Sequence, residues 1–480
     1  MLADNNLLKE KEQEILKEWK DFDENILNYL KSLSSDKKQK LLQQLNQFDL
    51  HYIKELKKYI LKTKSRKIPS FEPVDPIFYS EPHVDPLKEK MIHSGERIIK
   101  LGKVAVLLVA GGQSSRLGFD KPKGCFKASV IREKTLFQLF AEQICALQEK
   151  YQKKLFWYIM TSEENYTDII RFFEDNNFFN LDKNNIIFFQ QGKLPTFTSD
   201  GNLLLKTDDT LFVNPDGHGG LLDALNKNEL FAHMHKNELE YLYYFQVDNP
   251  LVNILDPAFL GYHVNHDADV STKVIKKSSS QEKIGVIGKI NNKLGVIEYS
   301  DLPETEKTKK NENGNLLFGF GSIAIHIFSI EFLCNMGGAL PIHLAEKKVN
   351  AFSFTGSSDC LSEKEAIKCE TFIFDTIPLA SKAIFVETSR EEEFAPIKNK
   401  TGIDSPETSK KAQIKKWLNW IVFAGLSLAP EYYDDIQIEI SPLFALDKYE
   451  FNQKVIENET VYNQLEKLKF YQEDVSIYIE

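Results

Sequence analysis

Residues Val104 to Phe126 read VAVLLVAGGQSSRLGFDKPKGCF, an apolar run followed by two glycines, an arginine, a further glycine and Pro-Lys-Gly. The run predicts a strand buried in a parallel sheet, and ligands bind beyond the carboxyl ends of such strands. Gly111 and Gly112 lack Cβ atoms and let backbone N–H groups approach an anion, while Arg116 and Lys123 supply positive charge. The segment therefore predicts a polyphosphate-binding loop in an α/β fold.

Two better-known phosphate loops do not fit this segment. A P-loop needs two glycines in a fixed spacing followed by Lys and Ser or Thr, and that pattern does not follow the strand. A dinucleotide-binding loop needs G-x-G-x-x-G at the start of a helix, whereas position 114 is serine and Pro122 interrupts the residues that follow. The loop is therefore of another kind.

The composition excludes several classes of protein. The chain has 480 residues, of which 42% are apolar and 27% charged, enough for two or three domains with full cores. A formal net charge of −10 argues against a nucleic-acid surface. The five cysteines have neither C-x-x-C spacing nor an even count, which argues against zinc and a disulfide framework. The first residues are charged and no apolar stretch is long enough to span a membrane, so we expect a cytoplasmic protein.

The pattern along the chain predicts three parts. Residues 1–95 have apolar side chains at helical spacing, which predicts an N-terminal helical unit that ends in a proline-containing connector. Residues 96–400 alternate apolar runs with helical stretches, which predicts an α/β domain with a central, doubly wound mixed sheet. Residues 401–480 contain a helical run through Trp417 and Trp420 and then QIEISPLFAL, which predicts a small C-terminal α+β domain.

The glycine-rich segment resembles the signature of the UTP-dependent sugar-1-phosphate uridylyltransferases, roughly L-x-x-G-G-x-G-T-R-L-G-x-x-x-P-K-G. The resemblance is closest to the UDP-N-acetylglucosamine pyrophosphorylases of eukaryotic type, and it continues in order through seven further segments. These are KTLFQLFAEQI (Lys134–Ile144), IIFFQQGKLPTF (Ile186–Phe197), NPDGHGGLLDAL (Asn214–Leu225), YFQVDNPLV (Tyr244–Val252), GVIEYSD (Gly295–Asp301), REEEFAPIKN (Arg390–Asn399) and IEISPL (Ile438–Leu443). The likeness covers nearly the whole chain and implies a nucleotide-sugar transferase fold, Rossmann-like in type, with UTP and a hexose-1-phosphate as partners.

The resemblance also implies where the triphosphate binds. The backbone of Ala110, Gly111 and Gly112 would hold the nucleotide, Arg116 would face the departing pyrophosphate, and Lys123 would bridge the phosphates. In the family's reaction an oxygen of the sugar-1-phosphate attacks the α-phosphorus of UTP. Positioning and charge therefore account for most of the catalysis.

Further nucleotide contacts are implied downstream. Gln191, in FFQQG, matches the family's uracil reader, because an amide can both donate to and accept from the imide edge of the base. Gly217, in PDGHGG, lets the backbone pass close to base and ribose. His218 is a further candidate for nucleotide binding, and the alternative is an ordinary loop residue. It departs from the pattern, since the acetylglucosamine enzymes usually carry asparagine there and the glucose-specific relatives carry histidine.

The resemblance implies magnesium as cofactor. Asp248 follows the apolar run YLYYFQV, and a carboxylate at such a strand end suits Mg²⁺, which prefers one or two carboxylates together with phosphate oxygens. Asp375, in TFIFD, is the candidate for a second ligand. The alternative is that Asp248 only starts a turn in Asp-Asn-Pro.

The sugar side carries a second departure from the family. Glu298 and Tyr299 match the Glu-Tyr pair that grips the sugar hydroxyls, and Lys398 matches the lysine that binds the sugar phosphate. Ser322, in GFGSI, stands where the family has an asparagine that contacts the sugar, and serine lacks the paired donor and acceptor of an amide.

Two alternatives remain open. His218 and Ser322 both leave the acetylglucosamine pattern, so glucose-1-phosphate or a broad range of hexose-1-phosphates is the alternative to N-acetylglucosamine-1-phosphate as substrate. Ser114 replaces the family's glycine in the loop, and if that position needs a positive φ, serine costs roughly 1 kcal/mol or more. This departure leaves room for a sugar-nucleotide sensor without turnover.

Overall fold

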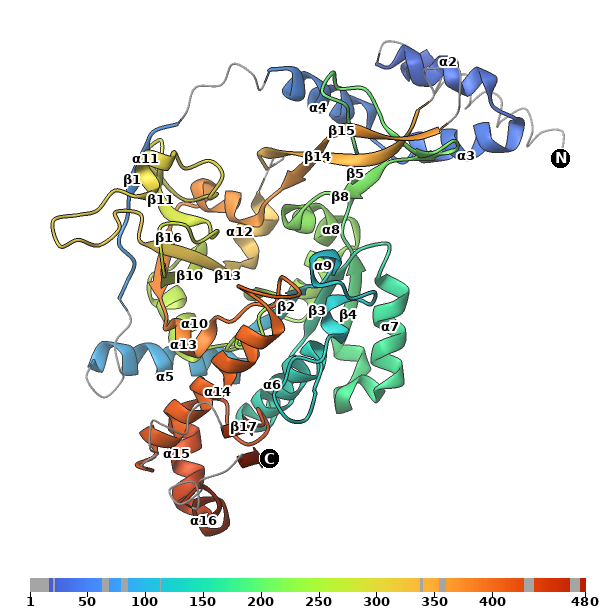
Figure 1. Cartoon of the computed structure of the whole chain (residues 1–480). Coiled ribbons are helices and arrows are strands. Elements are labelled where there is room, and N and C mark those ends of the chain that lie inside the picture. Colours follow the sequence, from blue (N-terminus) through green and yellow to red (C-terminus); the bar gives the residue numbers. More distant parts are fainter. Residues whose placement is uncertain are drawn as a thin grey trace. The chain divides into compact units, whose positions relative to one another are not determined.

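Figure 1 shows the computed structural model, which describes residues 17–19, 22–62, 69–78, 85–112, 114–336, 340–353, 360–426, 436–466 and 475–480. The chain falls into two compact units that interleave along the sequence. Unit 1 comprises Met1–Pro69, Gln191–Asp223 and Ala339–Asp375. Unit 2 comprises Ser70–Gln190, Ala224–Gly338 and Thr376–Glu480.

A ten-stranded mixed sheet forms the centre of unit 2 in the described part of the chain. Its parallel part consists of β9 (Tyr241–Gln246), β2 (Val104–Val109), β3 (Trp157–Thr161) and β4 (Ile186–Gln190), in this spatial order. Residues 104–108 of β2 are all buried, as expected for a strand covered on both faces. The strand predicted from the glycine-rich segment is therefore confirmed.

The sheet continues beyond β9 with antiparallel strands. β13 (Phe320–Ser329) pairs antiparallel with β9 and leads to β11 (Val286–Ile290) and β1 (Phe71–Pro73). The remaining strands are β10 (Val270–Lys276), β12 (Lys293–Ile297) and β16 (Ala383–Glu387). β10 joins β13 to β16, pairing antiparallel with the first and parallel with the second. Segments from distant parts of the chain thus meet at one sheet.

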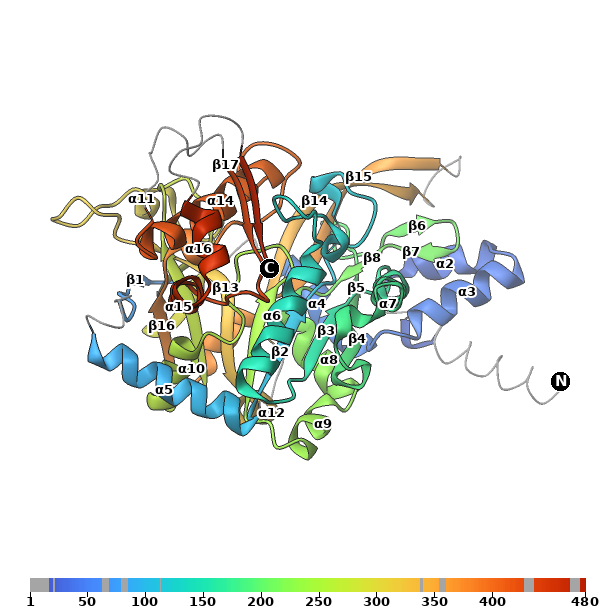
Figure 2. The same cartoon turned by 90° about the horizontal axis from the view of Figure 1, so that it is seen from below.

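Helices cover this sheet. α6 (Leu136–Tyr151) lies along the sheet (Figure 2). It packs there through Phe140, whose ring centroid lies 5.0 Å from that of Phe245 in β9. α7 (Tyr166–Asp175) packs through Phe173 against Trp157 of β3, with centroids 5.5 Å apart. These aromatic contacts belong to one large core, which also receives side chains from α5 (Pro86–Leu101) and α10 (Pro257–Asn265).

Helices α5 and α10 cross very closely. A Cβ added at Gly95 would lie 1.9 Å from the carbonyl oxygen of Pro257, and one added at Gly261 would lie 1.8 Å from that of Met91. Only glycine fits at these two positions because the backbones themselves are in contact. The shorter helices along the chain are α8 (Leu221–Lys227), α9 (Leu230–Lys236), α11 (Glu304–Lys307), α12 (Ile330–Asn335) and α13 (Arg390–Glu393).

The last part of unit 2 has its own core. α14 (Pro406–Phe423), α15 (Lys448–Glu457) and α16 (Glu459–Glu466) surround the parallel strand pair β17 (Ile436–Ile440) and β18 (Val475–Ile479). α14 begins with a capping box, in which the Ser405 side chain accepts from the Thr408 N–H and the Thr408 side chain accepts from the Ser405 N–H. The helix and strand predicted after residue 400 are confirmed.

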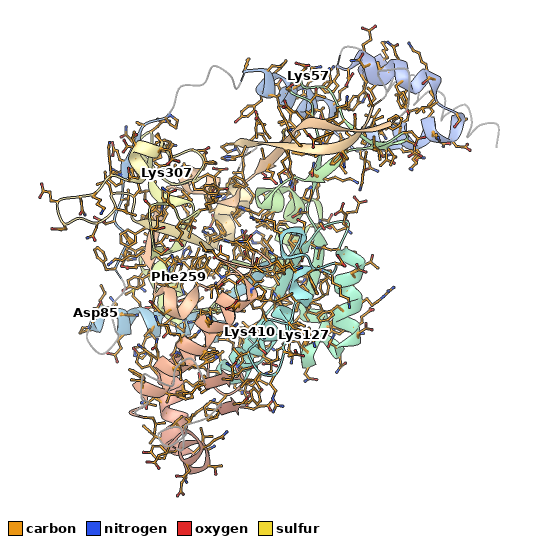
Figure 3. All side chains as sticks on the ribbon, in the orientation of Figure 1. Lys57, Asp85, Lys127, Phe259, Lys307 and Lys410 are labelled. Atoms are coloured by element: carbon orange, nitrogen blue, oxygen red, sulfur yellow. The ribbon has the colours of Figure 1, made fainter. Side chains whose placement is uncertain are left out.

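Unit 1 combines helices with a four-stranded sheet. α2 (Glu24–Ser32), α3 (Ser35–Leu45) and α4 (Leu50–Lys62) share a core with that sheet. Its strands are β15 (Cys360–Thr371), β14 (Ile342–Ser353), β6 (Leu205–Thr207) and β7 (Thr210–Leu211), and a separate ribbon pairs β5 (Lys193–Pro195) with β8 (Val213–Pro215). Lys57 of α4, labelled in Figure 3, donates to Oδ1 of Asn202 at 2.9 Å and so ties α4 to the middle segment of the unit.

The predicted α/β class with a central mixed sheet is confirmed. Helices follow one another from residue 24 onward as predicted, whereas residues 1–16 lie outside the described part of the chain. The predicted domain boundaries near residues 95 and 400 stay predictions. Within the described residues, no helix has the length and apolar character needed to cross a lipid bilayer.

Candidate active site

The glycine-rich loop leaves the carboxyl end of β2. Gly112 is exposed, and a Cβ added there would meet no atom within 4 Å, so its backbone faces open space. Ala110 differs, because its N–H donates to the carbonyl of Met160 at 2.8 Å and its carbonyl accepts from Nδ2 of Asn165 at 3.0 Å. The amides that an anion can reach therefore lie after Ala110, which anchors the loop to β3 and the residues that follow it.

Ser114 adopts an ordinary backbone conformation. Its φ is −81°, so the free-energy cost expected for a serine at positive φ does not arise. The buried Ser114 hydroxyl donates to the carbonyl of Lys121 at 3.2 Å and so closes the loop across the following turn. Further along the loop, Gly118 has a positive φ of +67°. The departure from glycine at position 114 is thus compatible with an intact loop.

Four charged residues gather where β2 and β9 end. Burial lowers the pKa of Lys123, the Asp248 carboxylate opposes this shift, and the positive charges of Arg116 and Lys398 reinforce it. The main chain holds their segments together, since Lys400 N donates to Arg116 O at 3.2 Å and Ile397 N donates to Asp248 O at 2.8 Å. The structure thus brings together four residues that the sequence predicted for the phosphate chemistry.

Asn249 fixes the segment that carries Lys398. Its buried side chain donates through Nδ2 to the carbonyl of Glu393 at 2.6 Å and accepts at Oδ1 from the N–H of Ala395 at 3.1 Å. Because Asn249 directly follows Asp248, the strand end and the Lys398 segment form one rigid piece. The Asp-Asn-Pro sequence therefore does more than start a turn.

A buried ion cluster lies behind this segment. Nζ of Lys273, in β10, lies 2.5 Å from Oε1 of Glu393 and 2.7 Å from Oδ2 of Asp256. Burial lowers the pKa of Lys273, but the two carboxylates outweigh burial and raise it, so the lysine stays charged. Sequence reasoning missed this cluster. The signal in the sequence was the lysine within the strand pattern VSTKVIK. A lysine at a buried strand position needs a carboxylate partner, so its presence there indicates a buried ion pair.

The residues predicted for the sugar lie at neighbouring strand ends. Glu298 directly follows β12, and a Cβ added at Gly285 would lie 3.5 Å from Oε2 of Glu298. The carbonyl of Gly285 accepts from the N–H of Ser322, in β13, at 2.8 Å. Tyr299 is 38% exposed and lines a cavity of about 190 Å³ together with Lys277 and Lys307. Glu298 and Ser322 are therefore close together, with Tyr299 at the rim.

The Ser322 hydroxyl already has a backbone partner. Its Oγ accepts from the N–H of Ala324 at 3.3 Å, where Ala324 has a φ of +55° in an irregular stretch of β13. The hydroxyl can still donate, but it cannot offer the paired donor and acceptor of an asparagine.

The remaining predicted residues belong to unit 1. Gly217 has a φ of +87°, and a Cβ there would lie 2.3 Å from the carbonyl oxygen of Thr371, so only glycine fits. Gln191 directly follows β4 and is half-buried. Nδ1 of His218 accepts from the N–H of Ile373 at 3.0 Å, and its ring stacks on Phe372 with centroids 5.1 Å apart. Burial, helped by His343, lowers the pKa of His218 to about 4, so this ring is a neutral packing element.

Asp248 is the predicted carboxylate that the charge cluster offers to a magnesium ion. Within the described residues, no group of three or more His, Cys, Asp or Glu side chains could hold a metal by itself. Asp248 stands among Arg116, Lys123 and Lys398, which fits a cation that takes its other ligands from phosphate oxygens and water. Asp375 is already engaged, because its Oδ2 lies 2.8 Å from Nε2 of His343 within unit 1.

Comparisons with known proteins agree with this geometry. The UTP–glucose-1-phosphate uridylyltransferase family model matches residues 51–403. A probable UDP-N-acetylglucosamine pyrophosphorylase of Dictyostelium discoideum is 35% identical over 82% of this chain and 84% of its own.

Two solved structures resemble the structure of this chain. One is the crystal structure of a putative UDP-N-acetylglucosamine pyrophosphorylase from Entamoeba histolytica, with a TM-score of 0.71 and 32% identity over 80% of this chain and 97% of the other. The second is a uridine diphosphate N-acetylglucosamine pyrophosphorylase from Trypanosoma brucei, with a TM-score of 0.82 and 23% identity over 98% of both chains, a likeness of fold. On the family match and the Dictyostelium relative, this chain belongs to the UTP–glucose-1-phosphate uridylyltransferase family of nucleotidyltransferases.

Proposed function

We propose that the protein is a magnesium-dependent uridylyltransferase that forms a UDP-sugar and pyrophosphate from UTP and a hexose-1-phosphate, with N-acetylglucosamine-1-phosphate as its preferred substrate. The observation that carries the proposal is the cluster of Arg116, Lys123 and Lys398 beside Asp248. The substrate follows from relatives such as the Dictyostelium protein, which is named for UDP-N-acetylglucosamine. A cytoplasmic location remains part of the proposal.

In the proposed reaction, a phosphate oxygen of the sugar-1-phosphate attacks the α-phosphorus of UTP and the bond to the β-phosphate oxygen breaks. Lys398 holds the attacking phosphate, Lys123 bridges the nucleotide phosphates, and Arg116 stabilises the departing pyrophosphate. When bound, Mg²⁺ would neutralise phosphate charge, held by Asp248. No side chain needs to transfer a proton, because both the nucleophile and the leaving group are phosphate oxygens.

The nucleotide and sugar contacts complete the proposal. Gly111, Gly112 and Gly217 give the nucleotide close approach to backbone, and Gln191 reads the uracil. Glu298 and Tyr299 hold sugar hydroxyls. Asp375 as a second metal ligand has less support than Asp248, since its carboxylate is paired with His343.

The hydrogen bonding of Ser322 supports a second proposal for the range of sugar substrates. Because its hydroxyl is hydrogen-bonded to Ala324 and it lacks an amide, the site offers fewer contacts that would single out one sugar. Glucose-1-phosphate, or several hexose-1-phosphates, is therefore the alternative.

The test is pyrophosphate release from UTP and Mg²⁺, with N-acetylglucosamine-1-phosphate and glucose-1-phosphate measured in parallel as kcat/KM. A clear preference for the acetylated sugar supports the proposal, and equal or reversed preference establishes the alternative. UTP binding without pyrophosphate release from either sugar would refute an enzyme and point to a sensor.

A further inference from the structure

One face of helix α14 carries the buried polar side chains of Ser409 and Gln413, which are 1% and 4% exposed. They lie four residues apart and therefore next to each other on the same side of the helix. Both side chains donate hydrogen bonds to main-chain carbonyls outside the helix, and the two carbonyls belong to the two segments that carry Lys398 and Lys123.

Ser409 holds the Lys398 segment. Its Oγ donates to the carbonyl of Ala395 at 2.8 Å, and the N–H of the same residue donates to Oδ1 of Asn249 at 3.1 Å. Both the carbonyl and the N–H of Ala395, three residues before Lys398, are therefore hydrogen-bonded to buried side chains. The backbone at the lysine itself is also held. The N–H groups of Lys398 and Asn399 donate to the carbonyl of Asp404 at 2.7 and 3.0 Å, and Asp404 lies just before the start of α14.

Gln413 holds the Lys123 segment. Its Nε2 donates to the carbonyl of Ala128 at 2.9 Å. Ala128 lies five residues after Lys123, and its own N–H donates to the carbonyl of Lys134 at 2.9 Å. A buried acceptor that loses its donor costs more than the average hydrogen bond contributes, so Ala128 would move if Gln413 could not donate.

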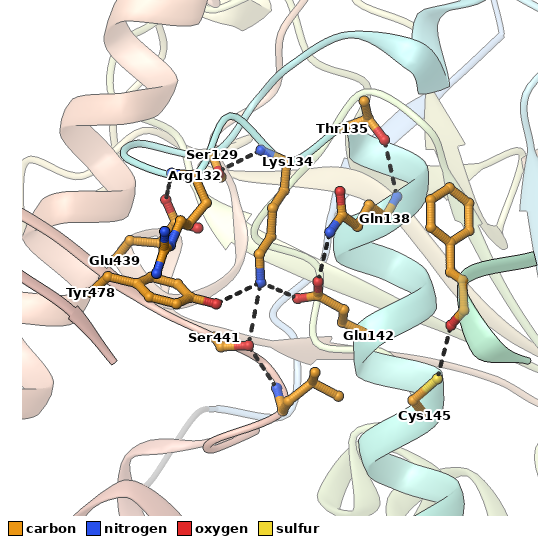
Figure 4. A network of polar contacts seen from close by, with 12 residues as sticks. Ser129, Arg132, Lys134, Thr135, Gln138, Glu142, Cys145, Glu439, Ser441 and Tyr478 are labelled. Carbon is orange, nitrogen blue, oxygen red and sulfur yellow. Dashed lines mark hydrogen bonds and ion pairs between the residues drawn. The ribbon is translucent and has the colours of Figure 1, made fainter. Parts of the chain in front are cut away.

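The far side of the turn from Ser129 to Lys134 is fixed independently (Figure 4). Nζ of Lys134 lies 2.6 Å from Oε2 of Glu142 in α6 and 2.9 Å from the hydroxyl of Tyr478 in β18. Oε2 of Glu439, in β17, accepts from the N–H groups of Ile131 and Arg132 at 2.6 and 2.9 Å. The tip of the turn is therefore held by α6 and the last strands, and the link from Ala128 to α14 runs through Gln413.

We infer that Ser409 and Gln413 are positioning residues that set the separation of Lys123 and Lys398, and with it the approach of the sugar phosphate to the nucleotide. This inference rests on the proposed function. The reacting atoms must come within about 3–3.5 Å of each other in line, and a 1 Å misplacement can reduce the rate by about 100-fold. Two hydrogen bonds to one helix face give the two lysines a common rigid reference.

The experiment is Gln413→Met in the full chain, because methionine keeps the volume and removes the donor. We expect kcat for pyrophosphate release to fall by about 10- to 100-fold. The matched control is Gln148→Met. Gln148 lies near the carboxyl end of α6, and its side-chain oxygen accepts from the N–H of Leu155 at 3.0 Å, so the control also removes a glutamine that is hydrogen-bonded to the backbone. We expect the control to lose thermal stability without loss of kcat. Near-UV circular dichroism at the assay temperature gives the folded fraction by which kcat is corrected.

A second pair of variants separates positioning from general stability. Ser409→Ala should also lower kcat, and the double variant should lose less than the product of the two single losses, because both side chains set one separation. If Gln413→Met does not fold, Ser409→Ala alone decides. A kcat per folded molecule within threefold of wild type, or an equal loss in Gln148→Met, overturns the inference. A wild-type protein without any pyrophosphate release overturns the proposed function instead, and the inference with it.

Discussion

Replacing Lys273 by methionine should be among the most damaging single changes in unit 2. The side chain is 1% exposed and is paired with both Asp256 and Glu393. Methionine fills a similar volume, so the cost comes from two buried carboxylates that lose their counter-charge, which typically amounts to about 3–5 kcal/mol. A whole domain is stable by only about 5–15 kcal/mol. We therefore expect the free energy of unfolding of unit 2 to fall by about a fifth or more.

The matched control is Lys411→Met, also in unit 2. Lys411 pairs with Glu407 at 3.1 Å, but both side chains are about three-quarters exposed, so the loss should stay below about 1 kcal/mol. Urea unfolding followed by tryptophan fluorescence suits the comparison, because three of the four tryptophans, Trp157, Trp417 and Trp420, belong to unit 2. The slope of the free energy with urea should not change.

The pH dependence gives an independent check. Burial raises the pKa of Glu393, and removing Lys273 takes away the charge that opposes this rise. A carboxyl whose folded-state pKa lies above its unfolded value gains stability as pH falls, so the penalty of Lys273→Met should shrink between pH 7.5 and pH 5. A loss below about 1 kcal/mol at pH 7.5, or no more than that of Lys411→Met, would refute the reasoning.

Four further outcomes are expected. Lys123→Ala should lower kcat/KM by at least about 100-fold, the scale of a lost transition-state charge contact, while replacement of Lys127, whose side chain is 64% exposed, by alanine should not; equal rates would remove Lys123 from the mechanism. His218→Asn should flatten the pH dependence of stability: the folded-state pKa of about 4 lies below the unfolded value, so wild-type stability decreases as pH falls from about 6.5 to about 4. Identical thermal-melting profiles of the two proteins over that range would contradict this. Ser322→Asn should raise the ratio of kcat/KM for N-acetylglucosamine-1-phosphate over glucose-1-phosphate, and an unchanged ratio would show that Ser322 does not read the sugar. Chelation of Mg²⁺ by EDTA should abolish pyrophosphate release and renewed Mg²⁺ should restore it, which persistent activity in EDTA would contradict.

The glycine-rich segment allowed much of unit 2 to be predicted. A short, wholly apolar run such as Val104–Val109 is typical of a parallel strand that is buried on both faces. The glycines and positively charged residues after it indicate an anion-binding site. The charge cluster was predicted from the resemblance to the uridylyltransferases, which matched Arg116, Lys123, Asp248 and Lys398 to motifs of that family. The spacing of apolar residues along a sequence indicates which side chains are buried, and residues 104–108 of β2 are buried as this spacing predicts.

Periodicity does not report partners, and this is where the sequence was insufficient. Nothing in the β13 pattern shows that it pairs with β9 and β10 at once. Nor does any local pattern show that described residues of the three segments of unit 1 would share a core. Hydrogen bonds such as that from Gln413 to Ala128, 285 residues away, depend on the folded backbone and leave no local pattern. Ser114 was judged by the glycine it replaces, whereas its actual φ decides the matter.

The network of Lys134 has a consequence for the order of events during synthesis. Lys134 and Glu142 are eight residues apart and can pair as soon as α6 has formed, but Tyr478 is 344 residues further on. At about 5–20 residues per second, a ribosome reaches Tyr478 roughly 20 to 70 s after Lys134. The turn next to the phosphate loop therefore spends most of translation without its last partner. A nascent chain with α6 already formed still lacks a finished catalytic loop until β18 has left the ribosome.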